Sequence, residues 1–282
     1  MPSRLPVLSF LLLAAAPALA APPSPAAGAG SPVRLVPHRA VYDLSLLSTR
    51  GARGIETARG RIAFDFTGNA CEGYALKFRQ VTVLTSTESG SKTSDLRTAH
   101  YESGDGRTFR FRHDTKTEEQ NKSVDGDAER KAGGPLGVRL KTPKRDRFDL
   151  DGDAVFPNAQ MRELIIAARE GRSTAPMKVF DGSEEGRNVY ETLAVIGSAV
   201  KAKPGEKLEE AARQDKLAAL TRWPVTLSYF KTGRGEQTPV YVLSFELYEN
   251  GVSRALKLDY GDFALRGEMT KLELLPDTAC QR

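Results

Sequence analysis

The chain has 282 residues, with 41 Lys and Arg against 36 Asp and Glu, three His and two Cys. Charged residues make up 27% of the chain, which argues against wholesale disorder and against a polytopic membrane protein. The few cysteines and histidines exclude a disulfide-dense scaffold, a four-cysteine zinc site and a histidine-rich metal centre. The net charge of +5 is small for this length, so nucleic acid is not an expected partner.

Residues 1–20 have the pattern of a secretory signal peptide. Arg4 precedes an apolar run that is shorter than the roughly 20 residues needed to cross a bilayer. Ala18-Leu19-Ala20 then forms a small-x-small cleavage site, so we predict cleavage after Ala20. A retained N-terminal anchor is the alternative. No later segment is apolar enough to span a membrane, and we expect a soluble, exported, periplasmic protein that is not an integral membrane protein.

Export changes the interpretation of Cys71 and Cys280. Disulfides persist in the periplasm and outside the cell, so these residues are expected to form a structural disulfide. Such a bond would tie the C-terminal end back near the start of the folded part, and the chain-entropy model gives about 5 kcal/mol for so long a loop. The alternative is a redox-active or metal-binding thiol pair, which normally uses cysteines close in sequence.

The mature chain divides into a leader and one folded part. Residues 21–37 are rich in Pro, Ala and Gly and offer little to pack, so we predict a flexible leader. No polar linker long enough to separate two domains interrupts residues 38–282. We therefore predict that residues 38–282 form a single β-rich domain.

The dominant hydrophobic period of this domain is two. The apolar residues in its clearest alternating segments are Tyr42, Leu44, Leu46, Ile62, Phe64, Phe66, Leu243, Phe245, Leu247, Leu256, Leu258 and Tyr260. A change of parity at Val81 and Val83 predicts a β-bulge near Gln80. Asn250-Gly251 lies between two alternating segments and is a hairpin signal. One-sided alternation predicts antiparallel strands with one buried face.

Two segments have helical patterns. Phe156-Pro157-Asn158 opens the first, and Gly171 is expected to end it. Its apolar residues recur at i, i+3, i+4 and i+7 and are Met161, Leu164, Ile165 and Ala168. The second segment covers residues 206–221 and has a thin apolar face, and the structure of residues 201–220 is left open by the sequence.

The predicted fold is mainly β. We expect a single large antiparallel wrapped sheet, spiral or barrel-like, of about a dozen or more strands with one or two helices. A sheet with so many strands has to curl or close to remove its edges, and a curled sheet of this size often encloses a cavity. The sequence leaves open whether the interior is a cavity or is packed.

Three short motifs resemble those of penicillin-binding proteins. They are Ser89-Gly90-Ser91-Lys92, Ser94-Asp95 and Lys231-Thr232-Gly233. The chemistry of that family places the Ser and the Lys one helical turn apart, whereas residues 85–94 have no apolar helical face and are typical of a hairpin tip. We interpret the motifs as chance matches in turns. We therefore predict no catalytic residues and a protein that is not an enzyme.

No cofactor or metal site is predicted either. The loop that starts at Asp149 resembles a calcium loop, but Ala154 and Gln160 occupy the positions that require Gly and Glu. A pair of catalytic carboxylates in the C-terminal strands remains as an alternative, that of an unrecognised periplasmic hydrolase. Its candidates are Glu246, Glu249, Asp259, Asp262, Glu268 and Glu273. The histidines are expected to be surface or hydrogen-bonded residues: His38, His100 and His113.

Several segments occur in an order that is typical of one family. They are His38-Arg39-Ala40-Val41-Tyr42, Thr67-Gly68-Asn69-Ala70-Cys71-Glu72-Gly73-Tyr74, Phe78-Arg79-Gln80, Ser94-Asp95-Leu96-Arg97-Thr98, Phe156-Pro157, Trp223-Pro224-Val225, Ser228-Tyr229-Phe230, Tyr248-Glu249-Asn250-Gly251-Val252 and Leu258-Asp259-Tyr260-Gly261-Asp262-Phe263. From about residue 37 to the end, this series resembles the EipB family of periplasmic cell-envelope integrity proteins. The resemblance implies a wrapped β-spiral, loosely similar to the LolA and LolB lipoprotein carriers. It also implies a bridge between Cys71 and Cys280 and a role in the Gram-negative envelope without known enzymatic activity.

Two non-catalytic functions fit the sequence. In the first, the curled sheet binds or carries a lipid, a lipoprotein or a periplasmic envelope protein. In the second, the protein is a surface-acting envelope scaffold with a packed interior. An apolar cavity open to solvent would favour the first function, and a filled interior with an exposed apolar patch the second. A cleft with two carboxylates of shifted pKa would favour the hydrolase.

Overall fold

The fold is taken from a computed structural model, which describes residues 32–50, 54–203, 205–233, 238–276 and 280. The predicted signal peptide, the cleavage site at Ala20 and most of the predicted leader lie outside the described residues. From Val33 onward the chain forms one compact unit. None of the helices in the described ranges is long and apolar enough to cross a membrane.

The described residues form 14 strands, two α-helices and one 3-10 helix. In chain order these are β1 (His38–Thr49), β2 (Ile55–Asn69), β3 (Gly73–Ser86), β4 (Gly90–Ser103), β5 (Thr108–Thr117), β6 (Asn121–Arg130), β7 (Leu136–Thr142), β8 (Asp146–Leu150), α1 (Pro157–Arg169), β9 (Thr174–Val179), β10 (Tyr190–Ile196), η1 (Glu210–Ala212), α2 (Asp215–Ala218), β11 (Arg222–Lys231), β12 (Tyr241–Tyr248), β13 (Ser253–Asp259) and β14 (Phe263–Leu274). The mainly β prediction is confirmed.

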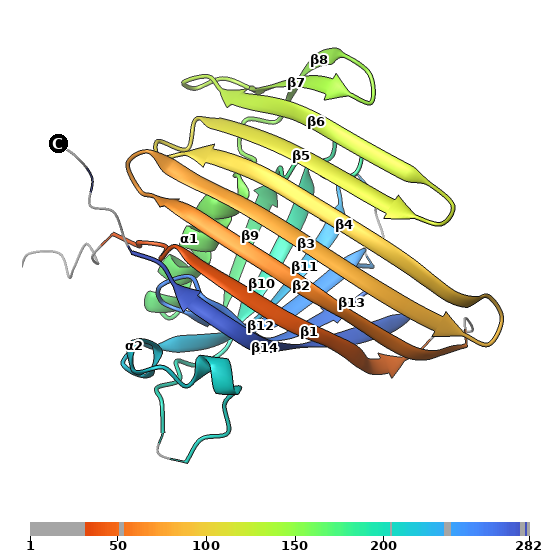
Figure 1. Cartoon of the computed structure of the whole chain (residues 1–282). Coiled ribbons are helices and arrows are strands. Elements are labelled where there is room, and N and C mark those ends of the chain that lie inside the picture. Colours follow the sequence, from red (N-terminus) through yellow and green to blue (C-terminus); the bar gives the residue numbers. More distant parts are fainter. Residues whose placement is uncertain (1–31, 51–53, 204, 234–237, 277–279, 281–282) are drawn as a thin grey trace, which may run out of the picture. The chain divides into compact units, whose positions relative to one another are not determined.

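All 14 strands belong to one antiparallel sheet with the order β8-β7-β6-β5-β4-β3-β2-β1-β14-β13-β12-β11-β10-β9. The chain lays down one half of the sheet from β1 outward to β8. It then crosses to the opposite edge at β9 and returns strand by strand to β14, which pairs with β1 from His38↔Leu274 onward. Strands β8 and β9 are left as the two edges, so the sheet is open. Figure 1 shows β1–β5 as the near wall of a curled sheet and β9–β13 as the far wall.

Helix α1 lies between these two walls (Figure 1). The predicted start and end are confirmed, because Pro157 is its first residue and Gly171 follows it with a φ of 72°. The N–H groups of Gly171 and Arg172 bond back to the carbonyls of Ala168 and Ala167, which closes the last turn. The helix therefore has a defined beginning and end inside the curled sheet.

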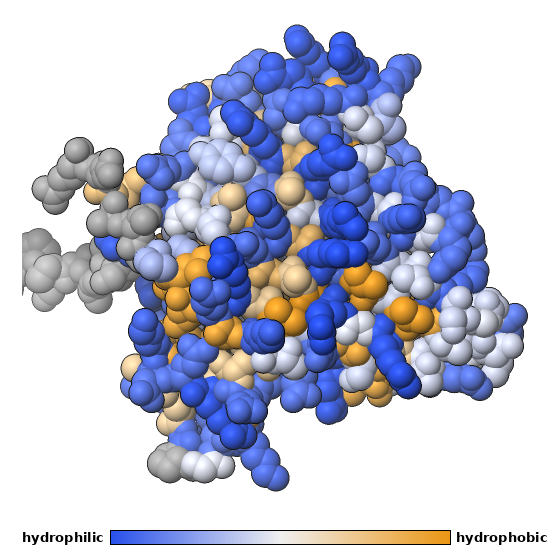
Figure 2. Space-filling model, in the orientation of Figure 1, coloured by the Kyte–Doolittle hydropathy of each residue, from blue (hydrophilic) through white to orange (hydrophobic). Residues whose placement is uncertain are grey.

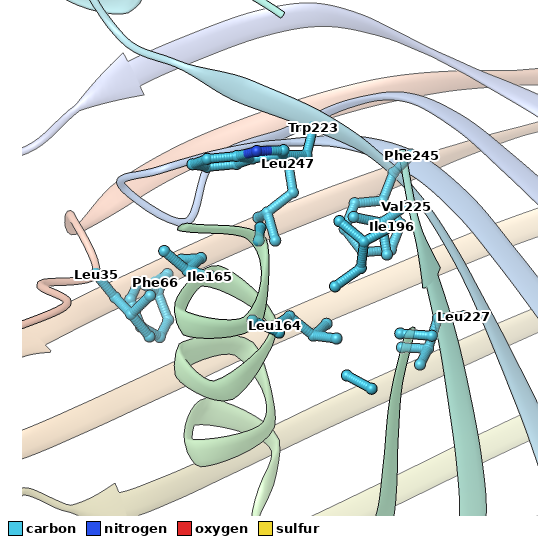
Figure 3. Close-up of a cluster of buried hydrophobic side chains, with 14 of the residues drawn as sticks. Leu35, Phe66, Leu164, Ile165, Ile196, Trp223, Val225, Leu227, Phe245 and Leu247 are labelled. Atoms are coloured by element: carbon cyan, nitrogen blue, oxygen red, sulfur yellow. The ribbon is translucent and has the colours of Figure 1, made fainter. Parts of the chain in front are cut away.

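The apolar stripe of α1 fills one end of the interior. Figure 3 shows Ile165 on the side of Leu35 and Phe66, and Leu164 on the opposite side, where Val225 and Leu227 lie. Both helix residues are fully buried. Strands from both halves of the sheet thus pack on one helix, and this cluster holds the two walls together.

The predicted bulge near Gln80 is wrong. Around Gln80, strand β3 pairs with β2 and β4 in unbroken register, with Ile62 opposite Gln80 and Gln80 opposite Leu96, and the register shift between β2 and β3 lies far from it at Ile55/Thr57. The parity never changes, because Gln80 faces the interior while Val81 and Val83 face outward. The sequence was misinterpreted because apolar side chains occupy the outer face here and a polar one occupies the inner face.

The helical pattern over residues 206–221, whose structure the sequence left open, corresponds to only a short helix. The described residues there form a loop with the 3-10 turn η1 and the four-residue helix α2. Leu217 and Ala212 are buried in the core cluster that includes Leu265 and Met269 of β14. The segment is fixed by packing on the sheet, and its helix-favouring composition does not decide its structure.

The packed chain begins before the predicted boundary at residue 38. Leu35 is only 4% exposed and belongs to the core cluster around α1. The N–H of Val36 donates to the carbonyl of Asn250, and the carbonyl of Pro37 accepts from Leu275. The last residues of the predicted leader are therefore packed on the folded unit, and its residues 21–31 lie outside the described residues.

Cys71 and Cys280 form the predicted disulfide. Their Cα atoms are 5.7 Å apart, and they are separated by 209 residues. Cys71 lies in the β2–β3 turn, where its N–H and that of Glu72 both donate to the side-chain oxygen of Asn69 at 2.9 Å. The bond thus attaches the C-terminal end of the chain to an ordered turn.

Candidate functional site: a cavity inside the curled sheet

The curled sheet encloses a cavity of about 560 Å³ that is partly open to solvent. Pockets of about 300–1,000 Å³ with predominantly apolar walls are typical of small-molecule sites. The lining residues come from β1–β4, α1, β10–β13, the β9–β10 loop and the loops that follow β11, β12 and β13. They are His38, Tyr42, Ile62, Phe64, Phe78, Gln80, Leu96, Met161, Asp181, Ser183, Glu184, Tyr190, Tyr229, Val240, Tyr241, Leu243, Phe245, Gly251, Ser253, Leu256, Leu258 and Tyr260.

Strand alternation explains the apolar wall. Ile62, Phe64 and Phe78 are inward positions of neighbouring strands, paired in the register Phe64↔Phe78. On the far wall, Leu243 and Leu258 are paired in the same way across β12 and β13. These positions were correctly assigned to the buried face from the sequence. The structure adds that they line a space instead of filling it.

Four tyrosines form a continuous arc along one side of the cavity. The ring centroids of Tyr190 and Tyr229 are 6.0 Å apart, those of Tyr229 and Tyr241 6.0 Å, and those of Tyr241 and Tyr260 5.2 Å. Burial raises the pKa of Tyr190 to about 12 and raises the pKa of the other three. All four phenols are therefore neutral at physiological pH, and they supply hydroxyl groups within an otherwise apolar wall.

The near wall contributes one amide to the cavity. Gln80 donates from Nε2 to the hydroxyl oxygens of Thr82, at 3.2 Å, and Tyr260, at 3.1 Å. It therefore connects the near wall to the tyrosine arc. Sequence reasoning missed Gln80 as a site residue, although a polar side chain at an inward position of an alternating strand was the available signal.

His38 and Tyr42 close the cavity at β1. Nδ1 of His38 lies 2.8 Å from the carbonyl oxygen of Val36, and the ring stacks on Phe64 at 5.1 Å. Burial lowers the pKa of His38, so its imidazole is neutral at physiological pH. The hydroxyl of Tyr42 donates to the carbonyl of Ser253 at 2.7 Å. Both polar groups are satisfied by backbone partners, so they present a neutral surface to the cavity.

The motif residues considered from the sequence do not line this cavity, although Lys231 pairs with the lining residue Glu184 at 3.2 Å. Lys92 pairs with Glu119 at 2.6 Å and lies at the start of β4, next to the β3–β4 turn that holds Ser89. Lys178 pairs with Asp151 at 2.5 Å and with Asp153 at 3.2 Å. Both sets are surface ion pairs. Within the described ranges, no group of three or more His, Cys, Asp or Glu side chains is arranged to hold a metal ion.

The carboxylates of the C-terminal strands do not gather in the cavity. Glu246 accepts from Arg222 at 2.6 Å and also pairs with Arg254 on the outer face of the sheet. Asp259 pairs with Arg50, and Glu273 lies 3.5 Å from Arg39. None of the six hydrolase candidates is among the described residues that line the cavity.

The remaining histidines lie on the inner side of β4 and β5. His113 contacts the hydroxyl of Thr98 and the carbonyl of Asp181, each at 3.0 Å. His100 is buried beside Phe109, with ring centroids 5.4 Å apart, and its Nε2 has no hydrogen-bond partner in the described part of the chain. The expectation of a hydrogen-bonded histidine is correct for His113, whereas His100 is a buried ring.

The outer face of the near wall has a different character. Cross-strand ion pairs run along it, such as Arg79 with Asp95 at 2.8 Å and Arg61 with Asp43 at 2.7 Å. Figure 2 shows this face as mostly hydrophilic, with apolar side chains grouped in its lower half. Exposed charge pairs of this kind contribute about 0–1 kcal/mol each, so their main effect is to keep the outer face hydrated.

The fold and the cavity define a class of protein, in which an open, curled, β-barrel-like sheet surrounds an apolar cavity. A crystal structure of a β-barrel-like protein of a domain of unknown function from Brucella abortus matches the fold with a TM-score of 0.79 and 37% identity, covering 86% of this chain and 100% of that chain. The cell envelope integrity protein EipB of Brucella abortus is 39% identical over 251 residues, which are 88% of each protein. The EipB-like family matches residues 29–276. The chain belongs to the EipB-like family, which is named for envelope integrity and not for an enzymatic activity.

Proposed function

We propose that the protein binds the acyl chain of a lipid, free or as part of a lipoprotein, and supports cell-envelope integrity in the periplasm through this binding. The observation that carries the proposal is the apolar cavity of about 560 Å³ between the two walls of the sheet. The envelope role is supported by the relationship to EipB of Brucella abortus. The periplasmic location is supported by the signal-peptide pattern and by the disulfide between Cys71 and Cys280.

The shape and chemistry of the cavity favour a flexible apolar chain. Its walls are aliphatic and aromatic side chains from both halves of the sheet, and water in contact with such walls is released when a chain enters. Leu243, Leu256 and Leu258 line one wall, and Ile62 and Phe78 line the other. A packed interior, which the scaffold hypothesis requires, does not fit a space of this size.

The test is to find what the protein carries. The protein is expressed with its own N-terminal segment in a Gram-negative host, purified from the periplasm, and examined by native mass spectrometry and lipid extraction. We expect stoichiometric lipid or lipoprotein on the wild-type protein. A clean mass without lipid, together with no rise in melting temperature when lipids are added, would refute the proposal.

Two matched tryptophan variants show where the lipid binds. Leu96→Trp places a large ring in the cavity from an inward position of β4, and Val83→Trp places the same ring on the outer face of β3. We expect Leu96→Trp to lose the lipid and Val83→Trp to keep it. Equal lipid content in both variants would show that the lipid binds outside the cavity.

A further inference from the structure

The charges that line the cavity are all of one sign. Among the described lining residues, Asp181 and Glu184 carry the carboxylates, and no Lys or Arg lines the cavity. His38 is the described lining residue that could become a cation by taking up a proton, and burial keeps it neutral because it lowers the pKa of the imidazole. A ligand that enters this space therefore meets neutral hydroxyl, amide and hydrocarbon groups and negative charge.

Asp181 is the carboxylate whose charge is left uncompensated. Its Oδ1 accepts a 2.9 Å hydrogen bond from the N–H of Ser183, and no cation pairs with it in the described part of the chain. Glu184, in contrast, pairs with Lys231 at 3.2 Å, and both side chains are 42% exposed. The two acids thus differ: Glu184 has a cationic partner, whereas Asp181 has none among the described residues.

The field of Asp181 reaches the tyrosine arc. Desolvation raises the pKa of Tyr229, and the negative charge of Asp181 raises it further. For Tyr190, desolvation and the negative charges of Asp181 and Glu184 outweigh the hydrogen bond from Ser183, and the pKa is raised to about 12. The negative potential of Asp181 therefore extends over this end of the cavity, where Ser183 and the tyrosine hydroxyls offer hydrogen bonds to a polar head group.

We propose that the cavity selects amphiphiles whose head group carries an ammonium ion and discriminates against those whose only charge is a carboxylate or phosphate, with Asp181 as the residue that sets this preference. The inference rests on the proposed binding of an acyl chain and names the class of ligand. An apolar space without cations strongly disfavours an anion, because its lost hydration is not replaced. An ammonium group beside Asp181 gains both charge pairing and hydrogen bonds.

Amphiphiles of equal chain length separate head-group preference from chain binding. Dodecylamine, dodecanol and dodecanoate are titrated below their micelle concentrations at pH 8, against the neutral fluorescent probe N-phenyl-1-naphthylamine bound in the cavity. We expect dodecylamine to displace the probe at concentrations about tenfold or more below dodecanoate, with dodecanol between them. The preference should weaken when salt is raised, because the charges are partly screened.

Asp181→Asn is the informative variant, because asparagine keeps an oxygen acceptor for the N–H of Ser183 and loses only the charge. We expect the ratio of the concentrations at which dodecanoate and dodecylamine displace the probe to shrink at least threefold. The affinity for dodecanol should stay unchanged. Glu185→Gln is the matched control: it removes the same charge from an exposed position of the same loop that does not line the cavity. It should leave the ratio as in the wild type.

The outcomes distinguish this inference from the function on which it rests. If the wild type binds dodecanoate as tightly as dodecylamine, the head-group selection is wrong and chain binding stands. If Asp181→Asn and Glu185→Gln change the ratio equally, Asp181 does not set the preference, and chain binding stands. If none of the three amphiphiles displaces the probe, both the selection and the acyl-chain function are refuted. The comparison in the wild type decides the matter even where a variant folds poorly.

Discussion

The carboxylate of Glu102 on β4 accepts a hydrogen bond from the backbone N–H of Asn158 at 2.8 Å, and these residues are 56 positions apart in the chain. It accepts a second from the N–H of Ala159 at 3.1 Å and lies 3.4 Å from the guanidinium of Arg162. Phe156 at the N-cap of α1 provides no side-chain cap. A strand of the near wall thus supplies the cap that the helix lacks, and it fixes α1 at the edge of the cavity.

Replacing Glu102 should loosen the helix. The side chain of Glu102 is 1% exposed, so Glu102→Ala leaves two N–H groups of α1 and the partly exposed guanidinium of Arg162 without their partner. We expect a loss of about 3 kcal/mol in the free energy of unfolding, measured by urea denaturation. Glu102→Gln keeps one acceptor oxygen and should lose about 1 kcal/mol.

Glu163→Ala is the control for this prediction, since Glu163 is an exposed carboxylate on the same helix. It should change the free energy of unfolding by less than about 0.5 kcal/mol. Equal effects of Glu102→Ala and Glu163→Ala would show that the hydrogen bonds to Glu102 do not hold the helix.

Sequence patterns predicted α1 but not its attachment. The signals of a helix are local, so Pro157, Gly171 and the apolar stripe located its beginning, its end and its buried face. The cap from Glu102 arises only when the sheet curls and brings β4 against the helix. No spacing in the sequence reports such a contact, because it depends on the order of the strands.

The sequence indicated that a sheet with so many strands would curl and could enclose a cavity. It did not identify the polar residues that line this cavity. Gln80 was hidden by Val81 and Val83, whose apolar side chains on the outer face made the alternation look shifted. Segment 206–221 was misinterpreted for a related reason. Glu206 and Glu209 favour a helix by propensity, but their carboxylates bind Arg222 of β11 and Arg254 of β13, and these contacts override propensity.

The disulfide should add substantially to stability. Replacing both Cys71 and Cys280 by Ser opens a loop that spans 209 residues. The unfolded chain then gains conformational freedom, and we expect a loss of between about 2 and 5 kcal/mol in the free energy of unfolding. The measurement is urea denaturation of wild type and double variant under non-reducing conditions. Added reductant should bring the wild type to the midpoint of the variant, and a variant as stable as the oxidised wild type would contradict the prediction.

Burial of His100 should make the protein acid-sensitive below pH 6.5. Desolvation, with a smaller effect of His113, lowers the pKa of His100 from 6.5 to about 3. Because the unfolded chain then binds a proton that the folded chain does not, stability falls as the pH drops between these two values. His100→Phe removes this titration, and Phe fits beside Phe109 without leaving an unpaired ring nitrogen.

The readout for His100 is the slope of the unfolding free energy against pH. Between pH 6 and 4.5 the slope of the wild type should exceed that of His100→Phe by up to about 1.4 kcal/mol per pH unit. The difference at pH 8, where imidazoles are neutral, measures packing alone and serves as the internal control. Burial lowers the pKa of His38 as well, so His38 contributes a pH-dependent slope that is the same in both proteins. Identical slopes in the two proteins would show that His100 is protonated in the folded state.

The outer loop of residues 205–220 should depend on one carboxylate. Glu209 pairs with Arg254 at 2.6 Å and accepts hydrogen bonds from the N–H groups of Ala255, at 3.0 Å, and Met269, at 3.2 Å. Arg254 is only 8% exposed, so Glu209→Ala leaves a buried guanidinium without one of its two carboxylates. We expect the loop to detach locally and the free energy of unfolding to fall by about 3 kcal/mol.

Limited trypsin digestion detects this detachment, because Lys207, Arg213 and Lys216 are exposed cleavage sites within the loop. In Glu209→Ala these sites should be cut at least tenfold faster than in the wild type, while sites in the sheet remain protected. Glu210→Ala changes the neighbouring exposed carboxylate and should be cut at the wild-type rate. If both variants are cut at the same rate, the loop is held by the burial of Ala212 and Leu217 and not by the ion pair. A second substitution, Leu217→Ala, should then produce the fast cleavage instead, since Leu217 is a fully buried apolar side chain of the loop.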